Sequence, residues 1–174
     1  MALDALSEVR QTPGVYLLVD LDGEAAYVGQ SGKLRTRLIQ HFVRQDSSVT
    51  SDGLLDVYEV WKIKGWYVPP ASLDEQGGVL FTAFQPRWNR RRLLSAPLAP
   101  NGDLPVPDFE IALIDETDLE VRRVPLQRIE NKLLHLVRAT RKARISGASS
   151  SVKRALGLHA SELQRLFGVF ADDL

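Results

Sequence analysis

The stretch that most constrains the fold is residues 13–42, which read PGVYLLVDLDGEAAYVGQSGKLRTRLIQHF. Two runs rich in β-branched and aromatic residues, 14–19 and 24–28, flank the pair Asp22-Gly23. An Asp-Gly pair between such runs favours a two-residue type I′ turn, because both central positions of that turn need a positive φ angle. We therefore predict a β-hairpin in this part of the chain.

The predicted turn also fixes which residues face each other across the hairpin. It pairs Val19 with Ala26 and Leu18 with Tyr27. Tyr16 lies two residues from Leu18 and therefore on the same face as Tyr27. The two tyrosines are then diagonal neighbours with backbones about 7–8 Å apart, a distance that aromatic side chains can span.

A helix is predicted after the hairpin, over roughly 33–44. Its apolar stripe recurs every four residues, at Leu34, Leu38 and Phe42. Arg37 and His41 are also four residues apart, so they share a different face of the helix. Two phenols, a guanidinium and an imidazole thus fall within one short stretch. Such a group fits either ordinary surface chemistry or a site for a phosphate.

Hydrophobic periodicity and turn signals place the remaining elements. The predicted strands are 54–68, as one long strand or a strand pair, and a second hairpin made of 109–114 and 119–124. The predicted helices are 73–85, 126–144, 150–158 and 161–170. We expect an α/β (α+β) fold in three parts, namely 1–95, a Pro-rich linker over 96–107, and a basic, mostly helical extension over 108–174.

The composition excludes several classes of protein. The 174 residues contain no cysteine, so neither a disulfide framework nor a thiolate metal site is possible. The N-terminal MALDALSEVR lacks the apolar run of a signal peptide, and no later segment approaches the length of a membrane span. We expect a cytoplasmic protein without a membrane partner.

The formal net charge of zero conceals a strong segregation of charge along the chain. Residues 103–120 carry seven acidic side chains and no basic one, whereas 121–165 carry eleven basic side chains and two acidic ones. Segregation of this kind is expected of a protein that binds a polyanion. A solvated helix face balanced by the acidic segment explains the basic stretch equally well.

Three groups of residues, in this order and spacing, resemble the GIY-YIG nucleases. The first is GVY (14–16), followed after ten residues by YVG (27–29). The second is Arg37, ten residues after the tyrosine of YVG, with His41 one helical turn later. The third is the closing segment FQPRWN (84–89). Several features in family order are more specific than the short signature alone.

The resemblance covers about residues 12–92. The family includes the N-terminal nuclease domain of the bacterial excinuclease and certain homing and restriction endonucleases. Membership implies a small three-stranded antiparallel sheet flanked by helices. It also implies hydrolysis of a phosphodiester bond, usually in DNA, with a single divalent metal ion (Mg²⁺ or Mn²⁺) held by a helix glutamate.

By this resemblance Tyr16 positions or deprotonates the attacking water, and Tyr27 orders the phosphate or the water. Arg37 clamps phosphate oxygens, for which a guanidinium offers a rigid fork of donors. His41 supports a tyrosine or donates to the phosphate, and Asn89 ties the closing segment to the site. Further basic side chains are expected to bind DNA: Lys33, Arg87, Arg90, Arg138, Arg141 and Lys142.

The metal ligand departs from the family pattern. In the family the glutamate precedes the closing asparagine by about a dozen residues, and twelve residues before Asn89 stands Gly77. On a continuous helix Glu75 is turned from that direction by roughly 200°. Glu75 therefore serves as ligand only if the helix begins near Gly77, or if a bulge at Gly77-Gly78 absorbs two residues.

The sequence thus predicts a metal-dependent DNA endonuclease with Glu75 as its metal ligand. In one alternative Gly77 replaces the ligand, and the chain is a GIY-YIG-like module that binds nucleic acid without cutting it. In another, Glu130 of the C-terminal helix supplies the carboxylate. A further alternative makes an interaction surface for another protein from three tryptophans, although core packing suits them better: Trp61, Trp66 and Trp88.

Overall fold

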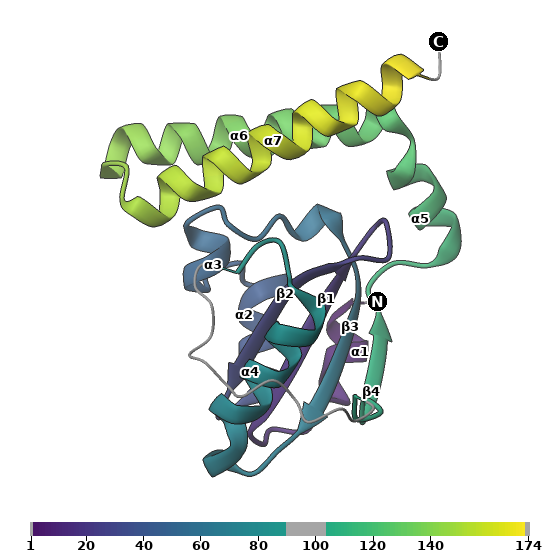
Figure 1. Ribbon diagram of the computed structural model, residues 1–174, viewed down its shortest axis with the longest axis vertical. Coiled ribbons are helices and arrows are strands. Elements are labelled where there is room, and N and C mark those ends of the chain that lie inside the picture. Colours follow the sequence, from purple (N-terminus) through teal and green to yellow (C-terminus); the bar gives the residue numbers. More distant parts are fainter. Residues whose placement is uncertain (1, 90–103, 173–174) are drawn as a thin grey trace.

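The structure is a computed structural model that describes residues 2–89 and 104–172 (Figure 1). It has the predicted α+β class and is built on one antiparallel sheet with the strand order β2-β1-β3-β4. The strands are β1 (Gly14–Asp20), β2 (Ala25–Ser31), β3 (Val60–Tyr67) and β4 (Phe109–Ala112).

The observed sheet has four strands, one more than the three that the resemblance implies. β4 comes from the part of the chain beyond the predicted linker and pairs with β3, with Ile111 opposite Ile63. The predicted second hairpin is wrong for the same reason, since residues 119–124 do not pair with β4 and are helical up to residue 123. A local pattern indicates that a segment is extended, but its pairing partner is set by the whole fold.

The first hairpin forms as predicted, but its turn differs. Leu18 does face Tyr27, whereas Val19 faces Ala25 because the register shifts by one residue at that point. Of the two residues expected at the centre of the turn, Asp22 and Gly23, only Gly23 has a positive φ, of 85°. The turn is therefore not of type I′. It is a three-residue loop with glycine in the left-handed region. The buried Asp20 carboxylate favours this loop, because it accepts hydrogen bonds from the backbone N–H groups of Asp22 (2.9 Å) and Glu24 (2.8 Å).

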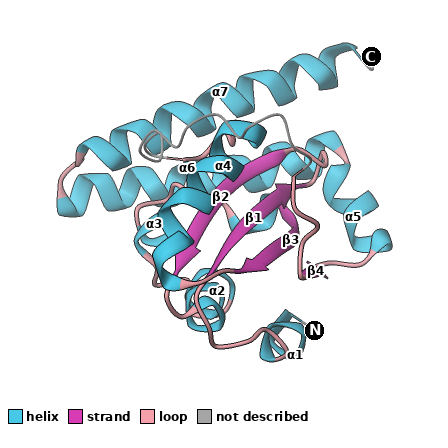
Figure 2. Cartoon of the chain, turned by 60° about the horizontal axis from the view of Figure 1, so that its bottom comes forward, coloured by secondary structure: helices cyan, strands magenta, loops and turns pink. Residues whose placement is uncertain are grey.

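Helices cover both faces of the sheet (Figure 2). Leu34 packs against Tyr16 on one face, and Leu80 packs against Leu17 on the other. Neighbouring residues of β1 therefore belong to two separate cores, as expected from the alternation of side chains along a strand. The helices involved are α1 (Ala2–Ser7) and α2 (Leu34–Phe42) on the Tyr16 face, and α4 (Leu73–Phe84) on the Leu17 face.

Three short elements complete this part of the fold: α3 (Ser48–Ser51) and the 3₁₀ turns Val57–Glu59 and Pro70–Ser72. Trp66 and Trp88 are each buried in one of the two cores, and Trp61 is half-buried against the core of Trp66. Trp66 and Trp88 therefore pack inside the protein, which agrees with core packing rather than with an exposed interaction surface.

The C-terminal part consists of α5 (Glu116–Arg123), α6 (Pro125–Ser146) and α7 (Ser150–Asp172). α6 and α7 form a helical hairpin that lies across one end of the sheet (Figure 1). In the part of the chain that the structure describes, no helix has both the length and the apolar composition needed to cross a membrane.

Two predictions for this region are corrected by local hydrogen bonds. Residues 119–124, expected as a strand, fall almost entirely in α5, because Asp115 caps that helix by accepting from the N–H of Asp118 at 2.8 Å. The two short helices expected at 150–158 and 161–170 are one continuous helix, α7. The hydroxyl of Ser161 does not cap a new helix but donates to the Gly157 carbonyl one turn earlier at 3.1 Å.

The predicted linker lies mostly outside the described residues, which resume at 104. In its described part, the carbonyl of Pro105 accepts a hydrogen bond from the indole N–H of Trp66 at 2.8 Å. This contact fixes the approach of the chain to β4 along the sheet.

The face of α6 that meets the rest of the molecule is charged. Arg128 and Lys132 are 4% and 0% exposed, whereas the apolar Leu126 and Val137 are 58% and 64% exposed. The same face also buries the apolar Ile129, which is 5% exposed, so it mixes charged and apolar side chains. Basic residues could be buried here because acidic partners from distant segments meet them, which no pattern within α6 reveals.

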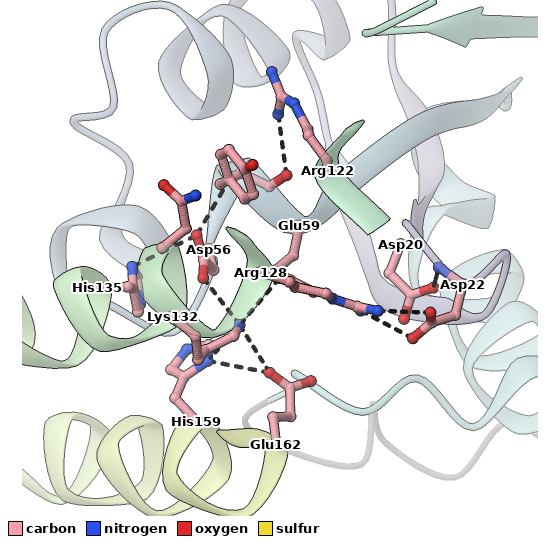
Figure 3. A network of polar contacts seen from close by, with 12 residues as sticks. Asp20, Asp22, Asp56, Glu59, Arg122, Arg128, Lys132, His135, His159 and Glu162 are labelled. Carbon is pink, nitrogen blue, oxygen red and sulfur yellow. Dashed lines mark hydrogen bonds and ion pairs between the residues drawn. The ribbon is translucent and has the colours of Figure 1, made fainter. Parts of the chain in front are cut away.

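Lys132 lies at the centre of these contacts (Figure 3). Its ammonium donates to Asp56 Oδ2 at 2.9 Å and to Glu162 Oε2 at 3.0 Å, and Glu59 Oε1 is 3.9 Å away. Burial alone would lower the pKa of Lys132, but the three carboxylates outweigh burial and hold the pKa above its ordinary value. Lys132 is therefore a permanent buried cation that joins α6 to the sheet domain and to α7.

Arg128 makes a second, parallel link. Its guanidinium donates to Asp22 Oδ1 at 2.6 Å and to Glu59 Oε2 at 2.7 Å. Arg165 of α7 reaches the same Asp22 at 3.1 Å. The acidic hairpin turn and the basic helices are therefore joined by charge-assisted hydrogen bonds.

We expect Lys132→Met to destabilise the protein by about 3–5 kcal/mol, because it leaves buried carboxylates without their cation. Urea denaturation followed by circular dichroism measures this loss. Lys153→Met, on the exposed side of α7, is the matched control and should change the free energy of unfolding little. Equal losses in the two variants would contradict a central role for Lys132.

Candidate functional site

Tyr16 of β1 and His41 of α2 form a buried hydrogen-bonded pair. Tyr16 Oη lies 2.5 Å from His41 Nε2, and His41 Nδ1 lies 2.7 Å from the hydroxyl of Ser47. Both rings are only 1% exposed. The distances fit a neutral imidazole that donates from Nδ1 to Ser47 and accepts at Nε2 from the phenol.

The glycine of the YVG segment makes this pair possible. Gly29 is directly opposite Tyr16 in the hairpin. A Cβ atom at Gly29 would stand 2.2 Å from Tyr16 Cζ, so the tyrosine ring lies across the glycine and reaches α2. The glycine of YVG is the sequence signal for this close approach, because any side chain at that position would clash with the Tyr16 ring.

Tyr27 and Arg37 complete a group of four residues. The Tyr27 ring is centred 6.2 Å from the Tyr16 ring and 6.3 Å from the His41 ring. The shared face predicted for the two tyrosines from the hairpin register is thereby confirmed. Arg37 is close enough for its charge to act on both Tyr16 and His41. Tyr27 and Arg37 are partly exposed, so they form the outer edge of a buried pair.

Burial makes the inner pair electrically neutral. It raises the pKa of Tyr16 well above the ordinary value, an effect that Tyr27 reinforces and that Arg37 only partly offsets. Burial, together with repulsion from Arg37, lowers the pKa of His41 to about 3. In this environment Tyr16 holds its proton and His41 remains uncharged around neutral pH. The pair is a rigid support rather than a ready source of a phenolate base.

Glu75, the expected metal ligand, does not meet the condition set by the sequence. α4 begins at Leu73 and is continuous through Gly77 and Gly78, both of which are buried. Glu75 is exposed on the first turn of this helix, which packs on the sheet face opposite to Tyr16. The charged side chain that shifts the pKa of both Tyr16 and His41 is the cation Arg37. These residues do not fit a divalent metal ion held by Glu75.

Two further acids, Asp74 and Glu130, also lie away from the Tyr16 pair. Asp74, next to Glu75, accepts a hydrogen bond from Gln30 at the end of β2. Glu130 is exposed on α6. Neither contact brings a carboxylate to the Tyr16 pair.

The closing segment serves to join strands and helices. Asn89 is buried and bonds both backbone groups of Val28 in β2, donating to the carbonyl at 2.7 Å and accepting from the N–H at 2.9 Å. The hydrogen-bonding role predicted for Asn89 thus takes the form of an extra link to the strand that carries Tyr27. Arg87 pairs with the buried Asp20 and approaches Glu162 of α7.

The side chains expected to bind DNA are distributed unevenly. Lys33, Arg138 and Arg141 are exposed. Lys142 donates to the backbone and side chain of Ser51, and Arg87 is engaged as described. Arg90 lies outside the described residues. Part of the basic charge of 121–165 is neutralised within the molecule, but not by the acidic segment 103–120. The partners are Asp22, Asp56, Glu59 and Glu162.

A second cluster of potential metal ligands lies where α6, α7 and the segment before β3 meet (Figure 3). One ligand atom each of Asp56, His135 and His159 lies within 4.8 Å of the others, so the cluster has the composition of a metal site. Each imidazole donates from Nε2 to the Gly53 carbonyl, at 2.9 and 3.0 Å. The Lys132 ammonium, 2.9 Å from Asp56 and 3.5 Å from His159 Nδ1, already supplies a cation at this position. Sequence reasoning missed the cluster because its members are far apart in the chain and carry no motif.

A cavity of about 510 Å³ adjoins this cluster between α6 and the segment that leads into β3. Two of the predicted DNA-binding residues, Arg138 and Lys142, line it together with Arg122. Its floor is apolar, with Leu55 and Val60. The cavity is basic at its rim but separate from the Tyr16 group.

Comparisons of the chain with protein-family models, with curated proteins and with solved structures gave no match. The resemblance to GIY-YIG nucleases therefore rests on the sequence features alone.

The buried neutral state of His41 predicts a pH dependence of stability. Its pKa is about 3 when folded and near 6.5 when unfolded, so the unfolded chain takes up a proton as the pH falls below 6.5. We expect the stability difference between wild type and His41→Gln to be constant above pH 6.5. Below it, wild type should lose up to about 1.4 kcal/mol per pH unit relative to the variant.

Urea unfolding of both proteins at several pH values between 7 and 4 measures this difference. His135, whose pKa burial also lowers, contributes the same slope to both proteins and cancels. A difference that stays constant through pH 5 would show that His41 is protonated or exposed in the folded state.

Proposed function

We propose that the protein binds nucleic acid by holding a backbone phosphate at Arg37 and Tyr27, on a GIY-YIG-like scaffold. The observation that supports this is the convergence of four side chains from β1, β2 and α2 into one group whose outer edge is partly exposed. DNA, double-stranded or branched, is the partner that the resemblance implies.

The geometry suits recognition of a phosphate. A guanidinium presents several donors in a plane and matches phosphate oxygens in pairs. The Tyr16–His41–Ser47 chain behind it is buried and hydrogen-bonded, so it holds the Tyr27 ring against a rigid surface. Lys33, exposed where α2 begins, adds a second positive charge on the same helix. A preorganised site of this kind loses little conformational freedom on binding.

Arg37→Ala should weaken binding to a labelled DNA duplex and reduce the slope of log affinity against log salt by about one. Arg37→Lys should retain the charge but recover only part of the affinity, because an ammonium cannot bind two oxygens in a fork. Fluorescence anisotropy at several salt concentrations measures both quantities.

Arg44→Ala removes a matched, exposed arginine just beyond the end of α2 and serves as the control. If Arg37→Ala and Arg44→Ala weaken binding to the same extent, DNA is held by general positive charge and not at this site.

A second candidate function, hydrolysis of DNA, is favoured by the 2.5 Å contact between Tyr16 and His41. In the GIY-YIG nucleases that the chain resembles, a metal-dependent cut uses residues of these types. The position of Glu75 on the other face of the sheet, together with the neutral inner pair, supports binding over cutting.

We therefore expect purified wild-type protein with Mg²⁺ or Mn²⁺ to nick supercoiled plasmid DNA no more than the Tyr16→Phe variant does. The plasmid assay should give the same result for Glu75→Ala, because Glu75 is distant from the Tyr16 group. Metal-dependent nicking that both substitutions abolish would instead establish an endonuclease with Glu75 as its ligand. Nicking lost only in Tyr16→Phe would place the metal ligand elsewhere.

A further inference from the structure

The outward face of α6 is rich in exposed apolar side chains. Leu126, Leu134 and Val137 are 58%, 48% and 64% exposed, and Ile145 near the end of the helix is 71% exposed. The opposite face of α6 packs on α7 and on the sheet domain through Arg128 and its neighbours. Exposed aliphatic residues that gather on one face of a helix mark a surface for another macromolecule.

Several exposed residues of this face correspond in pairs about the middle of the helix. About a point midway between residues 135 and 136, Glu130 exchanges with Arg141 and Leu134 exchanges with Val137. All four are exposed and, at 3.6 residues per turn, lie on one side of the helix. An acid therefore corresponds to a base, and an apolar residue to an apolar residue.

The correspondence continues outward from the centre. Leu126 exchanges with Ile145, so the two most distant members are again both apolar and exposed. Leu133 exchanges with Arg138, whose aliphatic stem can cover an apolar neighbour while its charge stays in water. A face with this arrangement is complementary to its own copy when the copy is turned through 180°.

We propose that α6 docks antiparallel on α6 of a second copy of this chain, forming a two-fold symmetric dimer. In such an isologous contact every pair occurs twice. Glu130 meets the partner's Arg141, and Leu134 meets the partner's Val137, each in two symmetric positions. The 22 residues of α6 span about 33 Å, enough for apolar contacts along several turns.

Charge distinguishes this occupant from DNA. Glu130 lies on the same line of the helix as Arg141, where its carboxylate would repel a phosphate backbone but can pair with the partner's Arg141. The buried links of Arg128 and Lys132 hold α6 in place, so its outward face is already ordered. The inference goes beyond the proposed function and assigns Arg141 to a protein partner.

Charge reversal tests the pairing directly. Glu130→Arg places two bases opposite each other at both Glu130–Arg141 positions, and Arg141→Glu places two acids there, so each variant should repel its own copy. In sedimentation velocity experiments on the full chain we expect wild type to dimerise and each single variant to raise the dissociation constant about tenfold or more. An equimolar mixture of the two variants should return to the association of wild type, because an acid then meets a base at both of the 130–141 positions.

Two matched controls place the same charge changes elsewhere: Glu120→Arg on α5 and Lys153→Glu on α7, both exposed. They should associate as wild type does, and circular dichroism checks that every variant folds. Wild type that is monomeric at about 0.1 mM overturns the proposal. Single variants that associate like wild type, or a mixture that fails to recover, overturn it as well. If wild type is monomeric and Arg141→Glu instead weakens DNA binding, the face belongs to nucleic acid.

Discussion

The structure depends on one buried ammonium group. Lys132 is surrounded by Asp56, Glu59 and Glu162, which come from the entry to β3 and from α7. Taking these charges out of water is costly, and only their mutual attraction and hydrogen bonds offset the cost. The sheet with its covering helices and the α6–α7 hairpin are consequently complementary parts of one charge network.

The same network reaches the candidate site through the closing segment. Glu162 accepts from the indole N–H of Trp88 at 2.9 Å, and Arg154 donates to the carbonyl of Asn89 at 3.0 Å. Asn89 in turn bonds β2 at Val28, one residue from Tyr27. The C-terminal helices therefore support the edge strand that carries a proposed phosphate-binding residue, in addition to any contact of their own.

Local chemistry in the sequence predicts much of the hairpin and of the site. The pairing of Leu18 with Tyr27, the helix that carries Arg37 and His41, and the meeting of the two phenols all follow from short-range periodicity. What failed depends on distant partners. β4 needed β3, the buried carboxylate of Asp20 changed the turn, and Lys132 is buried because of acids that lie 70 or more residues earlier, such as Asp56.

The separation of opposite charges along the chain has a consequence for synthesis. Asp20, Asp56 and Glu59 are all buried, yet the cations that neutralise the last two are Arg128 and Lys132, made much later. While the ribosome is still translating the middle of the message, the emerging sheet carries acids that water must still solvate. The buried ion pairs of Asp56 and Glu59 can form only after α6 has been made, so the complete fold requires the last third of the chain.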